Sequence, residues 1–196
     1  MEGTNPVNKK LAAALSGGAV LVLALSGCSS DDGNDKLDAW AKQVCDAVQP
    51  QAKKIEAANA AIQKQTSDNS TPAAVRTTDA QAFQDMSDAY KAIGAAVQNA
   101  GAPNVDDGAT KQKNAVKELD DISAAYASLK TQVDKLNVKD QAKFADGLKD
   151  IATSLDKLSQ SGNDALKTLE EGDVGKAMAK QASCKSASAS ASATGS

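Results

Sequence analysis

Apolar residues recur along most of this chain with the spacing of an α-helix, and this spacing constrains the fold more than any other feature. From about residue 36 to residue 170, large apolar side chains mostly follow one another at steps of three, four or seven positions. Such steps place them on one face of a helix. Because no stretch shows a sustained alternation of apolar and polar residues, we expect no strands. The predicted fold class is all-α.

Four long helices are predicted, followed by a short fifth helix that runs from Asp173 to about Cys184. The long helices begin near residues 35, 72, 106 and 140, and they end near residues 65, 100, 136 and 169. Pro50 is expected to kink or split the first helix, and Gly162–Asn163 to bend the fourth. Thr71 is a predicted N-cap, with Pro72 at the first helical position. Four amphipathic helices with short connections predict an antiparallel four-helix bundle.

The chain contains no histidine, which excludes several kinds of chemistry. Histidine is the most frequent general base and the most frequent metal ligand in proteins. A serine-hydrolase triad and a histidine-based zinc or haem site are therefore excluded, and no cofactor or metal site is predicted. The formal net charge of −3 also gives no electrostatic basis for binding nucleic acid.

The first 27 residues have the three-part layout of a secretory signal peptide. Lys9 and Lys10 precede an uncharged, apolar stretch from Leu11 to Leu25, and two small residues follow it. The apolar stretch is shorter than the roughly 20 residues that a transmembrane helix needs. We therefore expect an exported protein and not a membrane-spanning one.

The quartet Leu25-Ser26-Gly27-Cys28 resembles the lipobox of bacterial lipoproteins. The resemblance implies that the sulfur of Cys28 receives a diacylglyceryl group and that the signal is cut immediately before this residue. The Ala/Asp/Lys-rich body behind the lipobox is similar in composition to small secreted lipoproteins of actinomycete bacteria. The protein is thus expected at the outer face of the cell membrane, attached through the lipid on Cys28. The alternatives are an ordinary signal peptide that leaves Cys28 free, and an uncleaved anchor.

The chain divides into four predicted parts. Residues 1–27 form the lipoprotein signal peptide, and residues 28–35 form a polar, flexible tether. Residues 36–184 form the helical bundle. Residues 185–196 form an Ala/Ser tail that is too poor in apolar residues to join a core and is expected to be disordered.

Two cysteines remain if Cys28 is lipidated. Cys45 lies on the apolar face of the first helix, and Cys184 lies where the last helix ends. A disulfide persists in the oxidising setting of an exported protein, so we predict a structural bond between these two residues. Two independent thiols are the alternative. A reactive thiol pair is disfavoured, because there is no C-x-x-C spacing and no basic neighbourhood to lower a thiol pKa.

No spacing of acidic residues selects a catalytic pair, since neighbouring acids on a helix point in different directions. The predicted function is therefore a non-enzymatic binding or interaction module that is anchored to the membrane and meets an unknown protein or cell-envelope partner. One alternative is an accessory or sensor subunit of a membrane complex. The other is a cell-wall hydrolase that uses two carboxylates, since such chemistry needs no histidine.

Overall fold

The structure, a computed structural model, describes residues 35–65, 70–160 and 164–186. Within these ranges it contains the helices α1 (Asp35–Gln65), α2 (Pro72–Ala100), α3 (Gly108–Asp134), α4 (Gln141–Gln160), α5 (Asp164–Glu170) and α6 (Asp173–Lys180). Residues 182–186 add one further helical turn. These ranges include no strand, so the predicted all-α class is confirmed.

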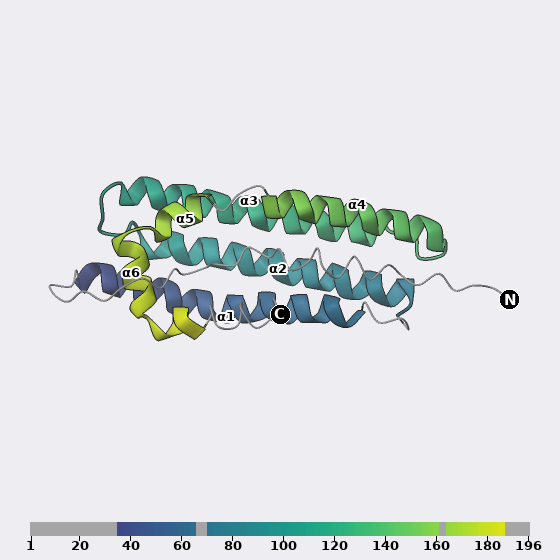
Figure 1. Cartoon of the computed structure of the whole chain (residues 1–196), viewed down its shortest axis with the longest axis horizontal. Helices are drawn as coiled ribbons and strands as arrows, with labels where there is room; N and C mark the ends of the chain where they lie inside the picture. The colour runs from purple at the N-terminus through teal and green to yellow at the C-terminus, as the bar shows by residue number, and fades with distance from the viewer. Residues whose placement is uncertain (1–34, 66–69, 161–163, 187–196) are drawn as a thin grey trace.

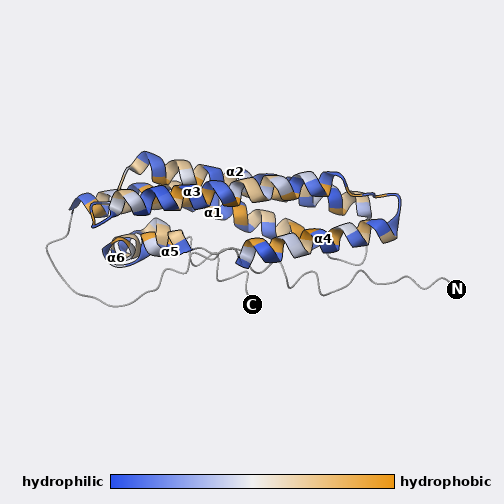
Figure 2. Ribbon diagram, turned by 90° about the horizontal axis from the view of Figure 1, so that it is seen from above, coloured by the Kyte–Doolittle hydropathy of each residue, from blue (hydrophilic) through white to orange (hydrophobic). Residues whose placement is uncertain are grey.

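The helices form two layers, one of three long helices and one of three shorter helices. In the first layer α2 lies between α1 and α3 and packs against both (Figure 1). Figure 2 shows α4, α5 and α6 in a second layer beneath these three long helices. There α4 and α5 pack on α3, whereas α6 packs on α1. Two shorter helices, α4 and α5, therefore occupy the place that one long fourth helix was expected to fill, and α6 lies within the predicted fifth helix.

The fourth predicted helix is divided in the structure. α4 ends at Gln160 and α5 begins at Asp164, on either side of residues 161–163, which lie outside the described part of the chain. Only two side chains of α4 are fully buried, Phe144 and Ile151. Those of Leu148 and Leu155 are partly exposed, because α4 packs mainly against α3.

Side chains cap the starts of α2 and α4, and Thr71 takes its predicted capping role. Thr71 Oγ1 accepts a hydrogen bond from the backbone N–H of Ala74 at 3.2 Å, with Pro72 at the first helical position. Asp140 Oδ1 accepts from the N–H groups of Ala142 and Lys143, both at 3.1 Å. Each oxygen satisfies donors that have no partner within the helix itself.

The structure corrects two expectations about helix continuity and capping. Helix α1 continues unbroken through Pro50, so the alternative in which it splits is wrong. Pro50 is exposed, and water can therefore satisfy the carbonyl that loses its helical partner. Asp107, expected to cap α3, has a left-handed backbone with φ of 58° and makes no capping hydrogen bond through its side chain.

The seam between α2 and α3 is built from small residues. Ala80, Ser87 and Gly94 follow one another at seven-residue spacing on α2. The hydroxyl of Ser87 donates to the Ser123 carbonyl at 2.9 Å, and the hydroxyl of Ser123 donates to the Ser87 carbonyl at 2.9 Å. A Cβ added at Gly94 would lie 3.4 Å from the side chain of Leu119. Small side chains thus let the two helices approach closely along this line.

Aromatic residues fill the core beside the seam. The Tyr90 and Tyr126 rings stack with centroids 5.5 Å apart, and Phe83 lies 6.1 Å from Tyr126. At the far end of α2, the Trp40 indole N–H donates to the carbonyl of Gly101 at 2.7 Å. This bond ties the first turns of α1 to the connection between α2 and α3.

Replacing Gly175 by alanine is expected to lower the free energy of unfolding by about 2 kcal/mol. A Cβ at this position would lie 2.0 Å from the carbonyl oxygen of Glu170, so the turn between α5 and α6 would have to shift. Chemical denaturation measures the change. Lys176→Ala on the same helix is the matched control, because Lys176 is exposed. A Gly→Ala change in an uncrowded helix stabilises it, so a more stable Gly175→Ala variant would contradict the predicted clash.

Candidate functional site

The two cysteines predicted to pair are joined in the structure. A disulfide links Cys45 of α1 to Cys184, with their Cα atoms 5.0 Å apart and a sequence separation of 139 positions. Both residues are buried, with 0% and 4% of their surfaces exposed. We call residues 173–186 the C-terminal strap, since this segment crosses to α1 and is bonded to it.

Apolar and polar contacts hold the C-terminal strap along α1. Val174, Ala177 and Met178 of α6 are buried. Three polar contacts then follow the direction of α1: Lys180 Nζ lies 3.1 Å from Asp38 Oδ2, the Ser183 hydroxyl donates to Asp46 Oδ1 at 2.5 Å, and Gln49 Nε2 donates to Ser186 Oγ at 2.6 Å. The strap therefore runs beside α1 for about three helical turns.

Two residues assigned to the predicted tail belong to a helical turn. Lys185 and Ser186 still belong to the helical turn 182–186, in which the Lys185 N–H donates to the Gln181 carbonyl at 3.2 Å. Residues 187–196 lie outside the described part of the chain. The predicted signal peptide, residues 28–34 of the tether and the lipidation site Cys28 also lie outside it. Among the described helices, none combines the length and the apolar character that crossing a membrane requires.

Two carboxyl groups are unusual for their burial. Asp79 on α2 is only 8% exposed, and its Oδ1 is buried without a hydrogen-bond partner among the described residues. Burial raises the pKa of Asp79 to about 7, and it raises the pKa of Glu170 at the end of α5 to about 7 as well. Desolvation penalises the charged form of each. The sequence analysis did not single out either residue.

A third buried carboxylate has a structural role. Glu118 on α3 accepts a hydrogen bond from the backbone N–H of Ala165 at 2.9 Å, and so it caps the start of α5 from a neighbouring helix. In residues 35–65, 70–160 and 164–186, no three cysteine or acidic side chains gather closely enough to hold a metal ion.

One hollow of about 350 Å³ lies on the seam between α2 and α3. Its lining is mostly polar and is supplied by Arg76, Thr77, Ala80, Gln81 and Gln84 of α2 and by Lys130 and Asp134 of α3. The sequence analysis missed this site. Its one visible signal is that Arg76 is the single arginine among the chain's many lysines.

Hydrogen bonds fix most of the polar side chains in the hollow. Lys130 Nζ lies 2.7 Å from Asp134 Oδ2. Gln81 Nε2 donates to Asp85 Oδ1 at 2.8 Å, and Gln84 Nε2 donates to Asp88 Oδ1 at 3.0 Å. None of the ion pairs found among the described residues includes Arg76.

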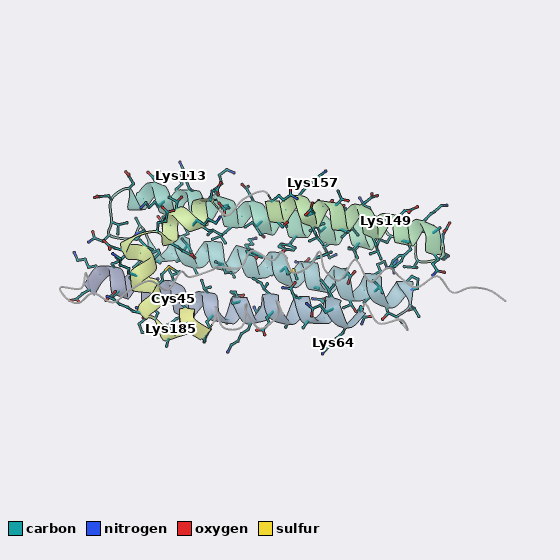
Figure 3. All side chains as sticks on the ribbon, in the orientation of Figure 1. Cys45, Lys64, Lys113, Lys149, Lys157 and Lys185 are labelled. Atoms are coloured by element: carbon teal, nitrogen blue, oxygen red, sulfur yellow. A yellow bond between two sulfur atoms is a disulfide. The ribbon has the colours of Figure 1, made fainter. Side chains whose placement is uncertain are left out.

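Four exposed lysines of the described helices lie on three different helices. Figure 3 labels Lys64 on α1, Lys113 on α3, and Lys149 and Lys157 on α4, and these four are spread over both layers. All four are exposed. The same view shows Cys45 where the C-terminal strap crosses α1. The hollow at Arg76 is thus a local feature and not the edge of a broad basic surface.

No family model, curated protein or solved structure matches this chain.

Proposed function

We propose that this protein is a lipid-anchored, extracytoplasmic binding module that holds a partner at the outer face of the cell membrane. The observation that carries the proposal is the lipobox-like quartet Leu25–Cys28, placed directly after an apolar stretch and before a short polar tether. Two acyl chains on one cysteine give stable membrane attachment, whereas a single chain holds a protein only marginally.

The disulfide supports export. Disulfides persist in oxidising compartments and are rare where thiols are kept reduced. The bond between Cys45 and Cys184 uses the two cysteines that lipidation of Cys28 leaves over. With these two cysteines paired, Cys28 is the one cysteine left for lipidation.

The geometry of α1 supports an orientation for the anchored domain. α1 begins at Asp35, seven positions after Cys28, and it continues for 31 residues. At 1.5 Å per residue this helix is about 45 Å long. The connection between α1 and α2, and with it the start of α2, therefore lies at the end of the domain opposite to the tether. A partner would meet the anchored domain at this end or along its sides.

Replacing Cys28 by serine is expected to move most of the protein from the membrane fraction to the medium, or to leave an uncut precursor. Serine cannot form the thioether to diacylglycerol on which attachment rests. Fractionation followed by intact-mass measurement checks this. Cys184→Ser is the matched control, since it also removes one cysteine but is expected to leave attachment unchanged. Membrane attachment of a normally processed Cys28→Ser protein would contradict the proposal.

The partner is open to direct measurement. Crosslinking on intact cells, followed by purification of the protein and mass spectrometry, is expected to recover one or a few specific envelope components with the parent protein. The Cys28→Ser variant should lose them, because it no longer resides at the membrane. Recovery of the same components with the released variant would show that binding does not depend on anchoring.

A further inference from the structure

We propose that the hollow between α2 and α3 binds an oxyanion, a carboxylate or phosphate group, through Arg76 with Lys130 beside it. This assignment rests on the proposed function as a binding module and names the chemical class of its ligand. The site is formed by residues 76–84 of α2 and residues 130–134 of α3.

Arg76 is the central residue because its guanidinium group is available. It is partly buried in the wall of the hollow, and it takes part in none of the ion pairs among the described residues. A guanidinium group presents its N–H donors as a planar fork that matches the two oxygens of a carboxylate or phosphate. The other cations of this chain are lysines, which lack this geometry.

The neighbouring side chains suit the same ligand. Gln81 and Gln84 each use one amide hydrogen on an acidic residue of their own helix, which leaves the second amide hydrogen free to donate. Lys130 adds a second positive charge. Asp134 also lines the hollow, and its carboxylate repels an anion. Its Oδ2 lies 2.7 Å from Lys130 Nζ, and this ion pair reduces the repulsion. With Arg76, the lining carries a net charge of one positive unit.

The shape of the hollow follows from the small-residue seam. At Ser87 the reciprocal hydrogen bonds with Ser123 close the space between the helices. At Gly94, Leu119 fills it. At Ala80, the third member of the series, a hollow of about 350 Å³ remains between the helices. A carboxylate or phosphate group with part of its carrier fits such a volume.

The position of the hollow suits an anchored protein. Arg76 lies in the second turn of α2, near the end of the domain opposite to the start of α1. A ligand there is held roughly the length of α2 away from the tether.

A titration of the full chain in nonionic detergent tests the site. Sodium acetate and sodium phosphate serve as separate probes, and the shifts of backbone amide signals in NMR spectra report binding. We expect saturable shifts, with millimolar midpoints, at residues 76–84 and 130–134. Arg76→Gln should weaken binding about tenfold or more, because it removes charge-assisted hydrogen bonds. Arg76→Lys should weaken it by less, since the charge remains.

Two further variants distinguish binding in the hollow from nonspecific attraction of the anion to positive charge. Lys91→Gln removes one exposed charge from the same helix and should leave the midpoint within about twofold. Ala80→Leu keeps every charge but fills the hollow, and it should abolish the saturable shifts. If Ala80→Leu disrupts the fold, Arg76→Gln and Lys91→Gln still decide the question. Equal weakening in those two variants, or no saturable shift in the parent protein, would overturn the assignment.

The two probes also distinguish a ligand with a carboxylate group from a ligand with a phosphate group. Tighter binding of acetate indicates a ligand with a carboxylate group, and tighter binding of phosphate indicates a phosphorylated one. The titration does not depend on the lipid at Cys28, whereas the fractionation experiment does. The titration therefore tests whether the hollow binds an oxyanion, and the fractionation experiment separately tests whether the protein is anchored.

Discussion

Replacing Cys45 and Cys184 together by alanine is expected to lower the melting temperature by about 10 °C. The bond joins positions 139 residues apart, and removing so long a closed loop restores entropy to the unfolded chain. The chain-entropy model gives about 5 kcal/mol as the upper value. For a domain of this size each kcal/mol corresponds to about 2 to 4 °C. Differential scanning calorimetry of the two proteins measures the shift.

The matched control for the disulfide variant is Ser183→Ala. This change lies in the same strap and removes one exposed hydrogen bond to Asp46. It is expected to shift the melting temperature by no more than about 4 °C, since such bonds contribute about 1 kcal/mol or less. A double-alanine variant that melts as the control does would show that the loop closure adds nothing to stability.

Asp79→Asn is expected to remove about half of the dependence of stability on pH between pH 5 and pH 8. In the folded protein burial raises the pKa of Asp79 to about 7, from its ordinary value of 3.8. The folded state therefore holds the proton more tightly than the unfolded state, and the parent protein loses stability as the pH rises toward 8. The shift corresponds to a loss of about 2.5 kcal/mol over this range. The asparagine side chain at position 79 does not titrate. The variant should therefore be the more stable protein at pH 8.

Chemical denaturation at pH 5 and pH 8 measures this difference. Asp88→Asn is the matched control on the same helix, because Asp88 is exposed, and it should keep the slope of the parent. The pKa of Glu170 is also raised to about 7, so a slope of comparable size is expected to remain in the Asp79→Asn protein. Identical slopes in the parent and in Asp79→Asn would show that Asp79 is not desolvated in the folded state.

Apolar spacing predicted the helices well because each helix is a local structure. The stripes on α2 and α3 coincide with the buried residues, and the capping residue Thr71 takes its predicted role. Gly162–Asn163 marked the place of a bend, but the spacing predicted one fourth helix and not the two helices α4 and α5. Apolar residues continue at helical steps from α4 into α5, whereas the break depends on how these helices pack on α3 and how α6 reaches α1.

The disulfide was predicted from the sequence, whereas the buried Asp79 and the hollow were not. Counting the cysteines left after lipidation was enough to predict the pair Cys45 and Cys184, although the geometry came only from the fold. Asp79 was missed because an acidic residue interrupts the apolar pattern and was taken as solvent-exposed. It lies seven positions before Met86, at the spacing of a core position. The hollow at Arg76 depends on two helices together, so neither segment shows it alone.

The covalent link between α1 and the C-terminal strap also limits how far the protein can be stretched. Tension applied through the two ends of the domain reaches Cys45 and Cys184 after only the outermost helical turns have been drawn out. The 139 positions between them then bear no load while the bond is intact. Without the bond, the same stretch would lengthen by about 450 to 500 Å when fully extended. A protein that is pulled through its two ends thus behaves as a short, nearly inextensible element while the bond is intact.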